Sequence, residues 1–175
     1  MRFFFFGTLA DADLLALVIG RPRPGSPVSA RLADHRLATV RGETFPMLVP
    51  ASGAWVPGVV IEGFDEADYD RILFFESIDY APRDVSVVLG PSETVPAIAF
   101  IATDAIADDG RPWDGDLWRR QDKAACLRET ALWMALYGYV DATEAERLWD
   151  AAVAEGRPLE DLVRAARGLD KAHDR

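Results

Sequence analysis

The stretch RFFFFGTL, residues 2–9, places an aromatic run directly before a Gly-Thr-Leu segment. An apolar run that ends at a glycine predicts a short buried strand over residues 2–6, followed by a turn at Gly7. Thr8 is expected to open a helix, because its hydroxyl can cap the first turn and Asp11 adds a carboxylate of the capping-box type. The chain is therefore expected to pass from a buried strand straight into a helix.

The segment Gly7, Thr8 and Leu9 brings backbone N–H groups together at that predicted junction. The first N–H groups of a helix have no partner within the helix, and they lie at the positive end of its dipole. A glycine also lets a ligand approach the backbone closely. Two interpretations follow from the residues alone: a cradle for a carboxylate or a phosphate, or an ordinary capped turn.

Short β-like segments dominate the chain up to residue 103. Glycine and proline separate them, and Asp65, with Asp68 three residues later, starts a helix that runs to Phe75. The expected strands after the first lie at 28–41, 45–50, 55–64, 85–89 and 95–103.

Beyond a loop at 104–115 the sequence predicts helices alone. A long helix follows the loop, Thr143 and Glu146 have the spacing of a capping box for a second helix, and Pro158 suits the first turn of a third.

The order of these elements predicts the fold class. Strands followed by helices indicate an α+β fold, and many short strands with short connections indicate a small, strongly curved sheet or a closed barrel. We expect a barrel domain over residues 1–138 and a C-terminal helical extension over 139–175, packed on the same domain.

The composition excludes several classes of function. The 175 residues include 19 basic and 29 acidic side chains, and the net charge of −10 disfavours binding to nucleic acid or to an anionic membrane. No apolar run is long enough to span a bilayer, and the N-terminus lacks the features of a signal peptide, so we expect a cytoplasmic protein.

The sequence offers no cluster of metal ligands. It holds one cysteine, Cys126, and two histidines, His35 and His173, and the aspartates between Asp104 and Asp116 lack the spacing of a calcium-binding loop. Cys126 lies in an Ala- and Leu-rich helical segment, where a small core residue is expected rather than a catalytic thiol. We expect no metal site.

Glu76 directly follows an apolar run. In RILFFESIDYAPR, residues 71–83, it comes after two phenylalanines and four residues before Tyr80. An ionised glutamate is rarely buried unless it is paired or hydrogen-bonded. Glu76 therefore either turns to solvent or to an ion pair, or is held partly desolvated with a raised pKa, which suits a group that transfers protons.

Three stretches of the chain, taken together, match the pattern of a known family. They are the aromatic strand that ends in Gly-Thr-Leu, VPGVVIEGFDEADYDRILFFESIDYAPRDVSVV at 56–88, and AFIAT at 99–103 with the Trp-bearing loop after it. The combination, which runs from Phe3 to about Trp118, resembles the gamma-glutamylcyclotransferase-like family, including gamma-glutamylcyclotransferase and gamma-glutamylamine cyclotransferase. The resemblance implies a small mixed β-barrel flanked by helices, and release of 5-oxoproline from a small γ-glutamyl substrate without a cofactor.

The resemblance also implies substrate-binding residues. Phe6, Gly7, Thr8 and Leu9 fall on the family's Tyr-Gly-Thr-Leu motif, whose backbone would hold the α-carboxylate of the substrate. Phe6 stands where the motif usually has a tyrosine.

The family's catalytic glutamate falls on Glu76, and its following aromatic and basic pair falls on Tyr80 and Arg83. The substrate's own α-amine would attack the γ-carbonyl, and one carboxylate can accept and return the protons of that reaction. Tyr80 either lines the pocket or only packs, and Arg83 either neutralises a substrate carboxylate or makes an ion pair at the barrel rim.

A second class of function stays open at this point. A non-enzymatic module could use the same barrel to bind a small acidic metabolite or a protein partner. The sequence gives neither the leaving amine nor the oligomeric state.

Overall fold

Alternate side chains of β1 (Arg2–Phe5) belong to two different cores. Phe3 and Phe5 pack with the helices, whereas Phe4 lies in a second cluster inside the barrel. Neighbouring side chains of a strand point to opposite faces, so a run of consecutive aromatic residues fits a strand that is buried on both faces. The strand predicted at 2–6 is confirmed, one residue shorter at its end.

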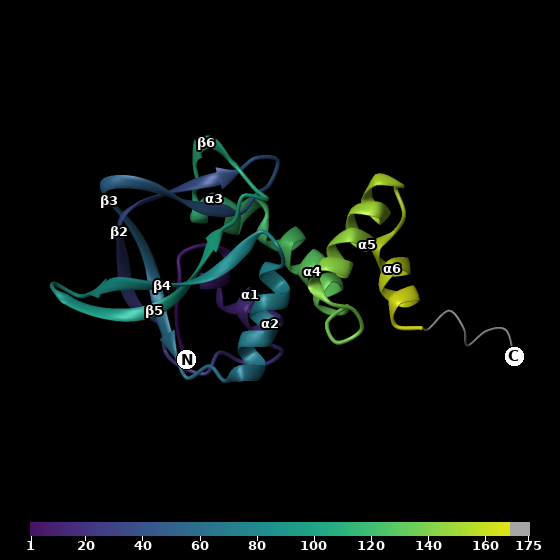
Figure 1. Ribbon diagram of the computed structural model, residues 1–175, viewed down its shortest axis with the longest axis horizontal. Coiled ribbons are helices and arrows are strands. Elements are labelled where there is room, and N and C mark those ends of the chain that lie inside the picture. The colour runs from purple at the N-terminus through teal and green to yellow at the C-terminus, as the bar shows by residue number, and fades with distance from the viewer. Residues whose placement is uncertain (169–175) are drawn as a thin grey trace, which may run out of the picture.

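A closed barrel of five strands surrounds the second core in this computed structural model, which describes residues 1–168 (Figure 1). The order of the strands is β3, β1, β5, β4 and β2, and β2 pairs with β3 to close the ring, while β6 extends the sheet beside β2. β1 pairs antiparallel with β3 and parallel with β5, so the sheet is mixed. The predicted α+β fold with a small mixed barrel is confirmed. The bounds of these strands are β2 (Val28–Val40), β3 (Pro46–Glu62), β4 (Tyr80–Leu89), β5 (Glu93–Ala102) and β6 (Asp108–Pro112).

Six α-helices of the described residues pack outside the barrel. The first helix stops at Gly20, which has a φ of 74°. As predicted, Asp65 and Asp68 start the second helix, where they form a capping box. The bounds of the helices are α1 (Ala12–Ile19), α2 (Glu66–Glu76), α3 (Gly115–Gln121), α4 (Lys123–Met134), α5 (Ala142–Ala154) and α6 (Leu159–Ala166).

The prediction that Thr8 opens an α-helix is wrong. Thr8–Ala10 form one 3₁₀ turn, η1. Gly7 is at its N-cap position, so no side chain caps this turn. The α-helix α1 begins only after Asp11, whose carboxylate accepts two backbone N–H groups at 3.1 and 3.3 Å. Because Asp11 supplies the cap, the dipole of α1 begins three residues beyond Thr8.

Two predicted strand boundaries also differ from the structure. The strands predicted at 45–50 and 55–64 are one continuous strand, β3, with a bulge at residues 51–54, which lie opposite the single residue Asp34 of β2. At that bulge Asp34 has a φ of 58°, and its carboxylate accepts the Gly53 N–H at 2.8 Å. The loop predicted at 104–115 contains β6, whose sequence DDGRP has no strand periodicity and which pairs with the end of β2.

Two predictions about the later helices are corrected as well. The long helix predicted after the loop is two helices, because Asp122 ends α3 and starts α4 with a φ of −111°. The capping box predicted at Thr143 and Glu146 is wrong, since Asp141 caps α5 and accepts a backbone N–H of its first turn at 2.8 Å. Glu146 is therefore in the second turn of α5, where its side chain is not used in capping.

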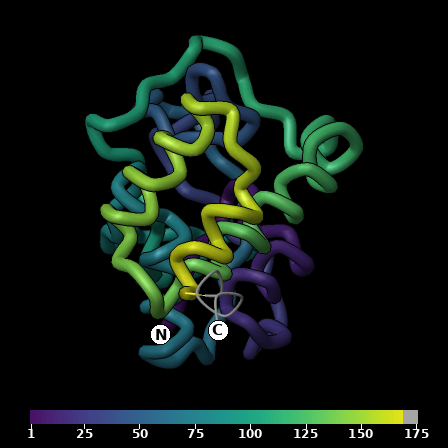
Figure 2. The backbone as a smooth tube through the Cα atoms, turned by 90° about the vertical axis from the view of Figure 1, so that its right-hand side faces the viewer, coloured from purple at the N-terminus to yellow at the C-terminus, as the bar shows by residue number. Residues whose placement is uncertain are grey.

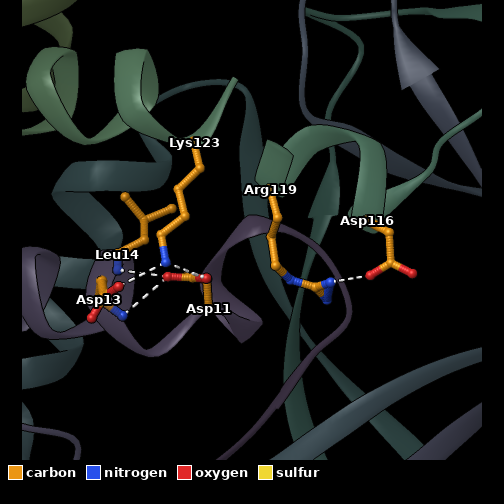
Figure 3. Close-up of polar contacts among 6 residues, drawn as sticks. All are labelled: Asp11, Asp13, Leu14, Asp116, Arg119 and Lys123. Carbon is orange, nitrogen blue, oxygen red and sulfur yellow. Dashed lines mark hydrogen bonds and ion pairs between the residues drawn. The ribbon is translucent and has the colours of Figure 1, made fainter. Parts of the chain in front are cut away.

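Lys123 joins the start of α4 to the start of α1 (Figure 3). Its ammonium group lies 2.8 Å from the Asp11 carboxylate and 2.7 Å from the Asp13 carboxylate. A separate ion pair within α3 joins Arg119 to Asp116 in the same view. The Lys123 contacts hold α4 beside the turn that carries Thr8.

The helices α5 and α6 form an outer layer beyond α4, as Figure 2 shows from the right-hand side of Figure 1. Ala145, Ala152 and Leu162 of this layer are buried in the same core cluster as Phe3. We therefore propose that the chain after residue 138 is an extension of the barrel domain. Residues 169–175, including His173, lie outside the described residues. Within residues 1–168, no helix has both the length and the apolar character needed to cross a membrane.

Candidate active site

One cavity of about 660 Å³ is lined by residues of the barrel strands and of the surrounding helices. Gly7, Thr8 and Leu9 line it from the turn after β1, and Glu76 and Tyr80 line it from the end of α2 and the start of β4. Residues that are far apart in the sequence, and that the family resemblance singled out, therefore meet in one cavity.

The last turn of α2 holds Glu76 in place. The indole N–H of Trp133 donates to the carbonyl oxygen of Phe74 at 3.1 Å, which fixes this turn to α4. The next residue, Ser77, has a φ of 51°, a conformation that residues other than glycine adopt rarely. This conformation ends the helix at Glu76, and the Ser77 hydroxyl donates to Oε2 of Glu146 in α5 at 2.7 Å.

The electrostatic surroundings of Glu76 favour its protonated form. Burial raises the pKa of Glu76 to about 8, and the negative charge of Asp79 contributes to the increase. Among the described residues, no hydrogen bond or ion pair to the Glu76 carboxylate acts against this increase. Glu76 therefore changes its protonation state close to neutral pH.

The turn at Gly7 has little space on its barrel side. A Cβ atom added to Gly7 would lie only 2.7 Å from Cγ of Pro46, the first residue of β3. The N–H groups of Ala10 and Asp11 donate to the carbonyl oxygens of Gly7 and Thr8, both at 3.0 Å. The first N–H groups of a helical turn have no partner within the turn, so those of Thr8 and Leu9 can bind a ligand.

Tyr80, which also lines the cavity, contacts the same proline. Its hydroxyl donates to the carbonyl oxygen of Pro46 at 2.8 Å, and its ring lies 6.3 Å from that of Phe45. Burial is the main cause that raises the pKa of Tyr80 above its ordinary value, and the negative charge of Glu76 adds to the increase. Tyr80 stays protonated and keeps the start of β3 in position.

The structure brings Phe6 to the cavity and leaves Arg83 outside its lining. Arg83 is exposed, and its guanidinium donates to the carbonyl oxygen of Pro82 at 3.3 Å. Residues three apart in a strand point to opposite faces, so Tyr80 and Arg83 cannot both face the cavity from β4. We therefore do not include Arg83 in the proposed site.

Sequence reasoning missed several residues of the cavity. Glu43 and Pro46 line it from the connection between β2 and β3 and from the start of β3, and Glu146, Trp149 and Asp150 line it from α5. The spacing of the α5 residues, at i, i+3 and i+4, was a signal that they share one helix face.

Cys126, Trp113 and Trp118 have different surroundings. Cys126 is half-buried and lines the cavity from α4, and burial raises the pKa of its thiol, so the thiol stays protonated. Trp118 is buried in the core, and Trp113 donates its indole N–H to the carbonyl oxygen of Thr44 at 2.8 Å. In the part of the chain that the structure describes, no group of three or more His, Cys, Asp or Glu side chains is arranged to hold a metal ion.

Comparison with known proteins identifies the family. A family model described as "Gamma-glutamyl cyclotransferase, AIG2-like" matches residues 3–120, which include the barrel, the turn at Gly7 and Glu76. The chain belongs to this family. AIG2-like protein D of Arabidopsis thaliana is 26% identical over 131 residues, covering 73% of this chain and 84% of that protein. AIG2-like protein C of the same plant is 25% identical over 122 residues, covering 69% of this chain and 70% of that protein.

Solved structures show that this AIG2-like chain has the fold of the family. A solution structure of an Arabidopsis thaliana protein has a TM-score of 0.55 at 24% identity, covering 75% of this chain and 82% of that one. A structure of a gamma-glutamyl cyclotransferase has a TM-score of 0.50 at 18% identity, covering 61% of this chain and 68% of that one. The helices α4, α5 and α6 lie after the residues that the AIG2-like family model matches.

Proposed function

We propose that the protein is a cyclotransferase that releases 5-oxoproline from a γ-glutamyl compound, with Glu76 as general acid and base. The observation that carries the proposal is that Glu76, with a pKa raised to about 8, shares one cavity with the backbone of Gly7–Leu9. A group whose pKa lies near the working pH both accepts and returns a proton readily. Membership in the family supports the same activity.

The proposed binding mode begins with the α-carboxylate of the γ-glutamyl group. We assign it to the N–H groups of Thr8 and Leu9, which a ligand can approach because Gly7 has no side chain. Since η1 is a turn of three residues, the attraction comes from these N–H groups and not from the dipole of an α-helix. The α-ammonium group then extends toward Glu76.

The reaction needs proton transfers and no external nucleophile. Ionised Glu76 takes a proton from the α-ammonium group, and the neutral amine attacks the γ-carbonyl carbon to close a five-membered ring. The bond between the γ-carbonyl carbon and the leaving nitrogen then breaks as Glu76 gives its proton to that nitrogen. Glu76 passes a second proton from the ring nitrogen to the released amine and ends ionised, so both protons lost by the α-nitrogen finish on the leaving amine.

The cavity contributes mainly by holding the substrate in a curled conformation. Holding the two reacting groups of one molecule together gives effective molarities of about 10⁵ M or more in favourable cases. A carboxylate that transfers protons and a backbone that binds the α-carboxylate are then sufficient for the reaction.

The direct test is incubation of the purified protein with a panel of γ-glutamyl compounds, scored by chromatography for 5-oxoproline. The panel includes γ-glutamyl amino acids, γ-glutamyl amines and glutathione. Release from at least one compound, faster than in buffer, is the expected result. Binding of a compound without release would instead favour a non-enzymatic module for small acidic metabolites, and absence of both would contradict the proposal.

A further inference from the structure

The cavity is strongly acidic beyond Glu76. Other carboxylates line it from several elements of the chain: Glu43, Asp79, Asp122, Glu129, Glu146 and Asp150. Among its lining residues, all within the described part of the chain, none is lysine, arginine or histidine. The carboxylates that face the cavity therefore have no cationic partner within its lining.

These carboxylates repel one another across the cavity. Burial is the main cause that raises the pKa of Glu43. The negative charges of Asp79, Glu129 and Glu146 add to the increase. Burial is likewise the main cause that raises the pKa of Asp79, and the negative charges of Glu146 and Asp150 add to the increase. A cation placed between these carboxylates would reduce their mutual repulsion and would be attracted by all of them.

The α5 face extends this acidic lining away from Glu76. Glu146 accepts the hydroxyl proton of Ser77, the neighbour of Glu76, and Asp150 follows one helical turn later. Trp149, between them, packs edge-on against Trp133 of α4 with ring centroids 5.4 Å apart. Val153, one further turn along, is 60% exposed and marks the open side of the cavity.

We infer that α5 binds the leaving amine and selects leaving amines whose far end carries a positive charge and no carboxylate. The inference rests on the proposed function, because it assigns the γ-glutamyl end of the substrate to the turn at Gly7 and to Glu76. The remaining part of the substrate must then lie along the acidic lining, with its aliphatic chain against Trp149 and its terminal ammonium group near Glu146 and Asp150. A diamine has this chemistry.

A leaving group with a free carboxylate would be repelled by the same acidic lining. It would enter a set of like charges with no cationic side chain to neutralise it, which disfavours both binding and approach. The cysteinylglycine part of glutathione has such a carboxylate, so glutathione is expected to be a poor substrate.

The test compares three substrates that differ only at the far end of the leaving amine. They are γ-glutamyl-1,4-diaminobutane with an ammonium end, γ-glutamylpentylamine with a methyl end, and γ-glutamyl-5-aminopentanoate with a carboxylate end. We expect kcat/KM for the ammonium compound to exceed that for the methyl compound by about 10-fold, with the carboxylate compound lower still. The preference should shrink as salt is raised, because screening weakens interactions in an open cavity.

Variants of α5 show whether this helix is responsible. Asp150→Asn and Glu146→Gln should each lower the ratio of kcat/KM for the ammonium compound to that for the methyl compound several-fold. The amide oxygen introduced by Glu146→Gln would still accept the hydrogen bond from the Ser77 hydroxyl. A third variant, Asp150→Lys, should reverse the preference and favour the carboxylate compound. The matched control is Glu144→Gln, because Glu144 is on the same helix, does not line the cavity and pairs with Arg147. That control should keep the wild-type preference.

The inference and the proposed function fail in different ways. Equal kcat/KM for the ammonium and methyl compounds would overturn the selection and leave the cyclotransferase activity intact. If no compound is turned over, the proposed function fails, and calorimetric titration of the three compounds decides the selection separately. Tighter binding of the ammonium compound, weakened by Asp150→Asn, would still support the role of α5, and equal binding would overturn it.

Discussion

The Tyr80 hydroxyl and the Pro46 carbonyl oxygen are joined by a hydrogen bond of 2.8 Å, and the ring of the same proline packs against Gly7. Tyr80 thereby fixes the segment that supports the proposed carboxylate-binding turn. Tyr80 is a positioning residue in this arrangement, since its hydroxyl is directed at the protein backbone.

Removing the Tyr80 hydroxyl should therefore weaken substrate binding more than chemistry. For Tyr80→Phe we expect KM to rise several-fold with kcat changed less, and a loss of stability of about 0.5–1.5 kcal/mol, the usual range for one hydrogen bond. Steady-state kinetics and urea unfolding measure the two effects. A large fall in kcat at unchanged KM would instead give the hydroxyl a direct part in the reaction.

Adding one carbon atom at Gly7 should disrupt the turn. In Gly7→Ala the new Cβ meets Pro46 Cγ at 2.7 Å, so the turn or the proline must move, at a cost of about 1–3 kcal/mol for an overpacked site. We expect a lower melting temperature and a strongly raised KM.

The matched control for this variant is the double substitution Gly7→Ala with Pro46→Ala, which removes the ring atoms that clash. It should recover stability and part of the binding relative to Gly7→Ala alone. If the double variant were no better than the single one, the contact with Pro46 would not be the reason for glycine at this position.

Glu76→Gln should remove turnover without unfolding the protein. The amide keeps the shape of the side chain but cannot accept a proton, and general acid–base groups contribute about 10² to 10⁴-fold to rate, so we expect kcat to fall by about 10³-fold. Binding of a γ-glutamyl compound, measured by calorimetry, should persist. Glu66→Gln, at the exposed opposite end of α2, is the control and should keep full activity. Near wild-type turnover by Glu76→Gln would remove Glu76 from the mechanism.

The raised pKa of Glu76 should appear in the pH dependence of activity. Only the ionised carboxylate accepts a proton, so kcat/KM should rise with pH and level off above the pKa of about 8. Asp79→Asn removes the negative charge that contributes to the increase, and the rising limb should then move to lower pH. An unchanged profile in Asp79→Asn would show that the limb belongs to another group.

Stability should depend on pH through the same residue. The pKa of Glu76 is about 8 in the folded protein against an ordinary 4.5, so between these values the folded state holds a proton that the unfolded chain has released. Stability from this group is therefore present below pH 4.5 and is lost as pH rises toward 8. Glu76→Gln lacks this loss, so it should be close to wild type near pH 5 and more stable near pH 9, by a few kcal/mol at most, since one pKa unit corresponds to about 1.4 kcal/mol. Denaturant unfolding at both pH values measures the difference, and equal curves would contradict a desolvated, protonated Glu76.

The elements that could be predicted were those set by local patterns. The aromatic run fixes β1 because consecutive large apolar side chains fit a strand buried on both faces, and Asp65 with Asp68 satisfies the first N–H groups of α2. Thr8 failed as a helix start because a better cap, Asp11, follows within the same turn. β6 has no pattern of its own and exists only because the end of β2 offers hydrogen-bond partners.

The candidate site likewise contains some residues that a local sequence pattern could predict and others that it could not. Glu76 and the turn at Gly7 stood out because each breaks or ends an apolar run. Glu43 and Asp150 did not, since an acidic residue in a polar segment is ordinarily solvated, and only tertiary packing brings both to one cavity. The distance of Arg83 from the cavity follows from strand periodicity, but the sequence pattern began that strand at residue 85 and so left Arg83 in a loop.

The position of α5 at the cavity has an evolutionary consequence. Under the proposed assignments, the chemical step depends on residues within 3–120, whereas the choice of leaving amine depends on a helix encoded after that stretch. Mutations in α5 can therefore change the substrate without touching the proton-transfer group or the barrel that supports it. After a gene duplication, two copies could keep one reaction and diverge toward different amines through a handful of codons in this helix.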